Sequence, residues 1–269
     1  MYRLVLCLTV LTLTACYEDT VGCLNPDAAN YDLQADEACP DDCCTFPSLA
    51  VRVTPRWEEA AVVAGGRYPH GSPGDSFTLV RFRFYLGELQ LEADGRALPP
   101  PEREVELFTA SGGSATPVIL NGNYLLATTQ ATTTTIGTVR TEGAGLTALT
   151  GTYGLPERYQ VVDPFLSPTG DALRTQPGRL NFNNGLGYVQ SRLEYVITPG
   201  DTLSVSSYGS LPFALDFGTP FFPPRGSDLR IDLSAQLDEL LGPIDLSADS
   251  ATIAAQLGRT VDFLQLAPQ

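Results

Sequence analysis

From Leu49 to its end, the chain consists of short stretches of β-type composition separated by Gly, Pro, Asn and Asp. In residues 77–86, FTLVRFRFYL, the alternation of a strand places apolar side chains on both faces. One face is expected to carry Phe77, Leu79, Arg81 and Arg83, and the other Thr78, Val80, Phe82 and Phe84. This distribution favours a strand that is packed at one end and solvated at the other. The strand and turn signals predict an all-β fold, a β-sandwich with Greek-key-like connections, with a closed barrel as the alternative.

Further strands are expected along the same region. They are residues 49–53, 88–93, 104–108, 123–128, 132–139, 188–197, 202–206, 212–217 and 228–233. The four threonines of residues 132–135 favour extended backbone because β-branching restricts χ1, although their low complexity also fits a flexible segment.

The end of the chain has a different pattern. Residues 250–264 are predicted to form a short C-terminal helix, because one helical face collects Ile253, Leu257, Val261 and Leu264. Ser247 or Asp249 is expected to cap its first turn.

The first fifteen residues, MYRLVLCLTVLTLTA, have the layout of a secretory signal. Their apolar run is shorter than the about 20 residues that a membrane-spanning helix needs. Residues 13–16, LTAC, resemble the lipobox of bacterial lipoproteins, which predicts cleavage before Cys16 and lipidation of its thiol. A lipid on Cys16 would anchor the protein in the cell envelope, at the outer membrane on its periplasmic or surface side. An ordinary signal with a chance cysteine is the alternative.

The cysteines that follow Cys16 are confined to one short stretch. They are Cys23, Cys39, Cys43 and Cys44, an even set in an exported chain, which predicts two disulfides. The sequence does not choose among the three pairings, but adjacent cysteines rarely reach disulfide geometry, so a bond between Cys43 and Cys44 is not expected. A zinc site is the alternative, although paired C-x-x-C spacings and histidines are lacking.

Residues 16–48 are predicted to form a lipidated, acidic, cysteine-rich spacer between the signal, residues 1–15, and a sandwich domain, residues 49–269. The stretch GCLNPDAANYD, residues 22–32, resembles the "GCTDPxAxNYDPxA…C" module of exported proteins in Bacteroidetes-type bacteria. A calcium site is a second interpretation of the spacer, with oxygen ligands from Asp27, Asn30, Asp32, Asp36 and Asp41. The strict alternation and glycine of known calcium loops are missing, so the disulfide-held spacer is favoured.

The net charge of −15 excludes some partners. All basic residues are arginines, and no basic cluster is visible in the sequence, whereas binding to nucleic acid requires clusters that neutralise phosphate. Nucleic acid is therefore not an expected partner, and the acidity is interpreted as a solvated surface that keeps the protein soluble.

Several segments resemble, in their order, the MbnP-like family of copper-binding proteins linked to methanobactin operons. Residues 77–95, FTLVRFRFYLGELQLEADG, are similar to the family stretch "GxxFTVTRLRYYLSNIRLxxxDG". Residues 177–195, PGRLNFNNGLGYVQSRLEY, are similar to "GMYWSWNSGYKFLKLEG", and residues 228–240 to "IxLxVDLxxLF". Tyr208 stands where the family often has "HIGG".

The resemblance implies a β-sandwich that binds copper through histidine, in some members beside a modified tryptophan, with a di-haem peroxidase-like partner. The matching positions here are His70 as metal ligand, with Trp57 and Tyr208 as further family positions. His70 is the only histidine, whereas a copper(II) site normally uses several nitrogen or oxygen ligands. A turn residue is the competing interpretation of His70, and a packed aromatic that of Trp57.

No catalytic constellation is present in the sequence. It lacks a G-x-S-x-G elbow and a phosphate-binding glycine loop, and a serine triad would have to recruit His70. The leading hypothesis is a non-enzymatic, lipid-anchored binding protein of MbnP-like ancestry with a role in copper handling. The alternative is a metal-free surface module that binds a protein or glycan partner through loops such as residues 221–224, FFPP. A calcium-dependent enzyme acting on envelope polysaccharides is a third hypothesis.

Overall fold

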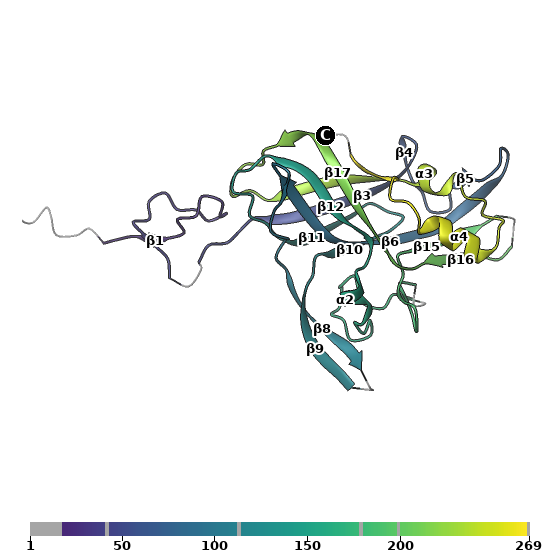
Figure 1. Ribbon diagram of the computed structural model, residues 1–269, viewed down its shortest axis with the longest axis horizontal. Helices are drawn as coiled ribbons and strands as arrows, with labels where there is room; N and C mark the ends of the chain where they lie inside the picture. The colour runs from purple at the N-terminus through teal and green to yellow at the C-terminus, as the bar shows by residue number, and fades with distance from the viewer. Residues whose placement is uncertain (1–17, 41–42, 112–113, 178–179, 198–199, 268–269) are drawn as a thin grey trace, which may run out of the picture.

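The computed structural model describes residues 18–40, 43–111, 114–177, 180–197 and 200–267. The predicted signal and the predicted lipidation site Cys16 lie outside the described residues. Within those ranges, no helix has the length and apolar character needed to cross a bilayer. The described chain forms two packed β-sheets with a protruding N-terminal segment (Figure 1). The prediction of an all-β sandwich is therefore confirmed.

The larger sheet has eight strands and is built around the long strand β6 (Ser76–Ala93). Its main path runs in the order β16, β15, β6, β12, β17, and β5, β7 and β10 also pair with β6. Their bounds are β5 (Arg67–Pro69), β7 (Arg96–Ala97), β10 (Tyr124–Ala127), β12 (Leu146–Gly154), β15 (Ser191–Val196), β16 (Leu203–Ser207) and β17 (Ser210–Phe221). β17 is consequently an edge strand of this sheet.

The smaller sheet has five strands in the order β11, β3, β18, β19, with β4 on β3. β3 and β18 run parallel, whereas the other pairs are antiparallel. The strands are β3 (Ser48–Trp57), β4 (Ala60–Ala61), β11 (Thr132–Thr138), β18 (Leu229–Gln236) and β19 (Leu264–Leu266). The threonine run at residues 132–135 is thus extended, as its β-branching predicts.

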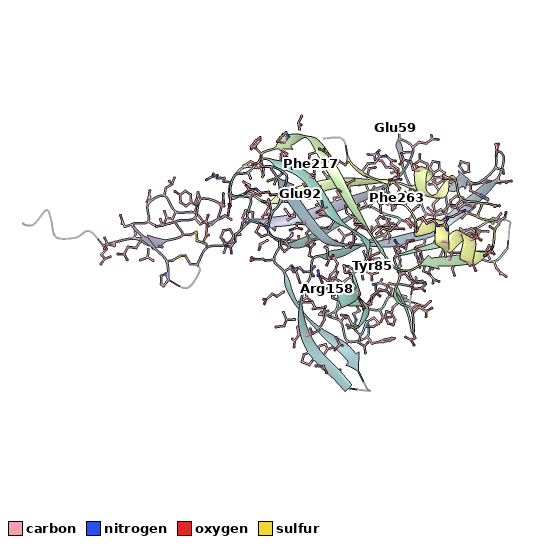
Figure 2. The ribbon with its side chains drawn as sticks, viewed as in Figure 1. Glu59, Tyr85, Glu92, Arg158, Phe217 and Phe263 are labelled. Atoms are coloured by element: carbon pink, nitrogen blue, oxygen red, sulfur yellow. A yellow bond between two sulfur atoms is a disulfide. The ribbon has the colours of Figure 1, made fainter. Side chains whose placement is uncertain are left out.

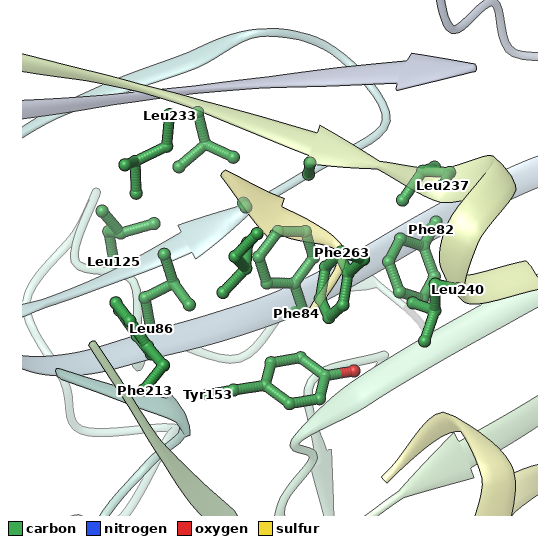
Figure 3. Close-up of a cluster of buried hydrophobic side chains, with 14 of the residues drawn as sticks. Phe82, Phe84, Leu86, Leu125, Tyr153, Phe213, Leu233, Leu237, Leu240 and Phe263 are labelled. Carbon is green, nitrogen blue, oxygen red and sulfur yellow. The ribbon is translucent and has the colours of Figure 1, made fainter. Parts of the chain in front are cut away.

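The core lies between the sheets and is rich in aromatic rings (Figure 3). Phe84 of β6 packs edge-on against Tyr153 of β12 and against Phe263, with ring centroids 5.9 and 5.6 Å apart. Edge-to-face contacts of this kind add to the stabilisation from burial itself. Leucines from both sheets, including Leu86 and Leu233, fill the space around the rings.

β6 departs from regular alternation at Val80. Leu79 pairs with Tyr195 and Arg81 with Glu194, so Val80 is the extra residue of a β-bulge. A bulge reverses the alternation after it, because it adds one residue to the strand. The buried side therefore collects Phe77, Leu79, Phe82 and Phe84, while Arg81 and Arg83 are only partly buried on the other side. The predicted assignment of Phe77 and Leu79 to the face of Arg81 and Arg83 is wrong for this reason.

A second cluster of buried residues covers the other face of the large sheet. It joins Tyr85 of β6 and Tyr124 of β10 to side chains of a hairpin and a long connecting segment. The hairpin is β8 (Glu104–Ser111) and β9 (Ser114–Asn121), and the segment contains α2 (Glu157–Gln160), β13 (Phe182–Asn183) and β14 (Gly187–Tyr188). Figure 1 shows the hairpin projecting away from the sandwich beside α2.

The chain ends with two short helices and β19. α3 (Leu237–Leu241) directly follows β18, and α4 (Ser250–Leu257) begins after Asp249, whose carboxylate accepts the backbone N–H groups of Ala251 and Thr252. The cap at Asp249 and the start of the predicted helix are confirmed. The predicted helix is too long, because α4 ends at Leu257 and Leu264 lies in β19. Gly258, a poor helix former, stands at this end.

Candidate functional site

The four spacer cysteines form two disulfides, Cys23–Cys44 and Cys39–Cys43. The pairing avoids the bond between adjacent cysteines, as expected from geometry. Besides the disulfides, the described part of the spacer contains the two-residue strands β1 (Val21–Gly22) and β2 (Glu37–Ala38) and few buried apolar side chains. Cross-links of this kind are typical of small modules that fold outside the cytoplasm.

Three of the residues proposed as calcium ligands, Asn30, Asp32 and Asp36, make local contacts within the spacer. The Asn30 side chain bonds to the backbone of Cys43 and Thr45, and Asp32 accepts the N–H of Gln34. Asp41 lies outside the described residues. In the described part of the chain, no three acidic, histidine or cysteine side chains are grouped as a metal site would require.

The spacer packs against the loop that follows β17. Asp27 lies 3.6 Å from the guanidinium of Arg225, measured from Oδ1 to Nε. Gly226 has φ of 70°, and a Cβ atom at this position would lie 2.7 Å from the carbonyl oxygen of Ala28. Only glycine permits so close an approach of the two backbones. The disulfide-bonded spacer is therefore in contact with the sandwich.

His70 is buried, with 4% of its surface exposed, although its sequence context suggested a turn. Its Nδ1 accepts the backbone N–H of Leu246 at 3.2 Å, and the hydroxyl of Tyr195 donates to the carbonyl of the same residue at 3.0 Å. The imidazole therefore helps to hold the segment between α3 and α4. Its Nε2 is buried and has no hydrogen-bond partner among the described residues.

Trp57 and His70 belong to one aromatic cluster that the sequence did not predict. Trp57 stacks at 4.5 Å from Tyr68 and at 6.0 Å from Phe77, and His70 meets Phe77 edge-on at 5.9 Å. Tyr208, the third family position, packs instead against the second buried cluster on the opposite face of the large sheet. The structure thus brings together two of the three family positions.

A network at the second cluster was also missed by the sequence analysis. The hydroxyl of Tyr124 lies 3.0 Å from both carboxylate oxygens of Asp171, which also accepts the N–H of Leu173 at 2.8 Å. Arg103 adds an ion pair at 3.5 Å. Burial, and then the negative charge of Asp171, raise the pKa of Tyr124, so its hydroxyl stays protonated and donates. No local sequence pattern predicts this network, because Arg103, Tyr124 and Asp171 lie far apart along the chain.

The clearest groove lies between the edge strand β17 and the strands β18 and β19 of the other sheet. It has a volume of 740 Å³ and is lined by Phe217, Thr219, Pro220, Phe221, Arg230, Ile231, Asp232, Leu266 and Ala267. We call it the edge groove. Arg230 donates to Asp232 at 3.1 Å between Nη2 and Oδ2, so the two charged residues that line the groove are paired with each other. The groove thus combines apolar side chains with polar groups, as ligand-binding sites do.

The edge groove arises from an irregularity in β17. Leu146 of β12 pairs with Phe221 and Ala148 with Asp216, so the intervening residues of β17 bulge out of the sheet. Gly218, with φ of 72°, allows the turn, and its N–H is accepted by the carboxylate of Asp216 at 2.6 Å. Bulges on edge strands redirect side chains and block pairing with other chains. Phe217 lies on this strand, away from Arg158 of α2 (Figure 2).

The predicted contact loop, residues 221–224, is divided by the structure. Phe221 is half-buried and lines the edge groove, whereas Phe222 is 67% exposed and does not line it. Pro223 is buried. Only the first residue of the loop therefore belongs to the groove.

A shallower concave surface of 900 Å³ lies between β9 and the large sheet. Several polar groups that line it are already paired within the protein. Thr150 and Thr152 donate to carbonyls of β6, Gln90 donates to Leu98, and Arg158 pairs with Glu88 at 2.5 Å. This surface offers few free groups for a polar ligand such as a glycan, which favours the edge groove as the binding site.

Comparison of the sequence with models of protein families gave no match, and comparison with curated proteins gave none either. Among solved structures, the fold is similar to that of MbnP from Methylosinus trichosporium, with 13% sequence identity and a TM-score of 0.41. The similarity covers 72% of this chain and 76% of that chain. It is a distant likeness in the course of the chain, and no residue role is transferred from it.

Proposed function

We propose that the chain is a lipid-anchored, non-catalytic binding module of the cell envelope that holds a partner protein in the edge groove. The observation that carries this proposal is the groove itself, in which apolar side chains such as Phe217 and Ile231 lie beside the paired charges Arg230 and Asp232. Protein interfaces combine an apolar centre with a polar rim in the same way. The lipobox at Cys16 and the two spacer disulfides support a location outside the cytoplasm.

The partner is expected to insert aromatic or aliphatic side chains into the groove. An added strand is disfavoured, because β17 bulges at this point and because Pro220 has no N–H to donate. Buried anchor residues usually carry most of the affinity of such interfaces. Phe217 and Phe221 supply the largest apolar contact area on this side of the groove.

The test compares three variants in pull-down experiments with the lipidated protein from solubilised native envelope. Phe217→Ala and Phe221→Ala are each expected to lower the recovery of one specific partner about tenfold, since an interface anchor contributes about 1–2 kcal/mol. Phe222→Ala is the matched control, because the neighbouring ring is exposed outside the groove. Equal recovery by all three correctly folded variants would contradict the proposal.

Copper handling through His70 is the second candidate function. It is supported by the free Nε2 of His70 and by the packing of His70 and Trp57 around Phe77. Because Nδ1 accepts the Leu246 N–H, the neutral imidazole carries its proton on Nε2, so copper would bind at Nε2 only with release of that proton to solvent. A di-haem peroxidase-like partner belongs to this candidate.

Copper titration of the purified protein tests the second candidate. Binding of Cu(I) or Cu(II) is expected to weaken at least about tenfold in His70→Ala, because imidazole is the preferred ligand. Asp201→Ala, an exposed substitution, serves as the control. The same affinity in wild type and His70→Ala would remove His70 as a ligand.

A further inference from the structure

Three arginines meet one carboxylate on the face of the large sheet that is turned away from the core. In the register of β6 and β15, Arg83 lies opposite Arg192, and Arg81 lies opposite Glu194. Opposed residues in an antiparallel pair have Cβ atoms about 5 Å apart, and like charges in this position destabilise the sheet. Such a concentration of positive charge is unexpected in a chain with a net charge of −15.

Glu194 is already shared between two of the arginines. Arg192 Nε donates to its Oε1 at 3.1 Å, and Arg81 Nη1 lies 3.5 Å from its Oε2. Two nitrogens of Arg83 are left without a partner: its Nε and Nη1 are buried and donate to no oxygen of any described residue. Burial, and then the charge of Arg81, lower the pKa of Arg83, whereas the charge of Glu194 raises it. A guanidinium nevertheless stays protonated at neutral pH.

The nearby Tyr85 does not supply the missing negative charge. Burial raises the pKa of Tyr85, and its hydroxyl donates to the carbonyl of Ala172 at 2.7 Å. Buried N–H groups without an acceptor cost free energy, and this cost disappears when an acceptor is added. An anion can reach the cluster from the side of Arg81 and Arg192, whose side chains are 41% and 24% exposed.

We propose that Arg83 and Arg192, supported by Arg81, bind an oxyanion, a phosphate or carboxylate group, over β6 and β15. The planar guanidinium fork binds two oxygens of either group at once. The site is separate from the edge groove, because β12 lies between β6 and β17 in the sheet. Loss of anion binding at the arginines would therefore leave partner binding at the edge groove unchanged, and the reverse also holds.

The test is calorimetric titration of the folded protein at constant ionic strength, with inorganic phosphate in one arm and acetate in the other. The arm with the tighter binding identifies the preferred oxyanion. Arg83→Gln is expected to weaken binding at least about tenfold, and Arg83→Lys, which keeps the charge but loses the fork, is expected to weaken it as well. Arg259→Gln is the matched control, because Arg259 is exposed and lies outside the cluster.

Glu194→Gln is expected to change the affinity for the anion in the opposite direction. Removal of the competing carboxylate frees Arg81 and Arg192, so the anion is expected to bind more tightly. Phosphate also stabilises proteins generally by exclusion from their surface, but that effect is the same in all variants. The proposal is overturned if neither anion binds the wild type, or if folded Arg83→Gln and Arg83→Lys both bind as tightly as the Arg259→Gln control.

Discussion

Asp171→Ala is expected to lower the free energy of unfolding by about 2–5 kcal/mol, since a buried donor left unpaired costs about 1–3 kcal/mol. The substitution would orphan two such donors, the hydroxyl of Tyr124 and the N–H of Leu173. The ion pair with Arg103 adds little to this figure, because one third of the Arg103 side chain is in contact with solvent. Urea denaturation followed by circular dichroism measures the change.

Asp171→Asn is the matched control for this prediction. The amide oxygen still accepts the N–H of Leu173, so the loss is expected to be clearly smaller than in Asp171→Ala. Because Tyr124 and Asp171 join β10 to the segment that covers the sheet, Asp171→Ala should also speed amide exchange in that segment. An Asp171→Ala protein as stable as wild type would show that the network contributes little.

Cys16→Ser is expected to move the protein from the membrane fraction to the soluble fraction almost completely. A serine cannot carry the thioether-linked lipid, and buried acyl methylenes contribute about 0.8 kcal/mol each, so the loss of the chains removes the anchor. Fractionation of cells followed by immunoblotting, with mass spectrometry of the mature N-terminus, measures the effect.

Cys7→Ser is the control for the anchor, because Cys7 lies inside the predicted signal and is removed with it. This variant is expected to stay in the membrane fraction with an acylated Cys16. Membrane retention of Cys16→Ser, or a mature protein with an intact Met1 and an unmodified Cys16, would contradict the lipoprotein prediction.

The sequence was sufficient to predict the fold class, most strands of the sandwich and the cap of α4. These features depend on local composition, such as β-branched residues and the position of Asp249. β12 was missed, because Gly151, Gly154 and several threonines weaken its apolar alternation. The side chains of β6 were assigned to the wrong faces, because no local sequence feature marks Val80 as a bulge. The pairing of β6 with β15 determines the position of the bulge.

The candidate sites were less accessible to sequence analysis than the fold. Phe221 was recognised as a possible contact, but the edge groove needs residues from three strands of two different sheets, β17, β18 and β19. The sequence also showed no basic cluster, whereas strand pairing brings Arg83 and Arg192 side by side. His70 was expected in a turn, and its burial depends on Leu246 in the segment between the last two helices. In each case the deciding contact is long-range.

The contact of the spacer with the loop after β17 has a consequence for the geometry of recognition at the bilayer. Acylation of Cys16 would place the spacer with β1 at the membrane-proximal end of the protein and α4 at the distal end, since β1 and α4 lie at opposite ends of the molecule (Figure 1). Phe217 of the edge groove lies in the half of the sandwich nearer to the spacer (Figure 2), so the groove would open on the membrane-proximal half of the sandwich. A partner attached to the same membrane would then meet the groove at a height that the disulfide-bonded spacer sets.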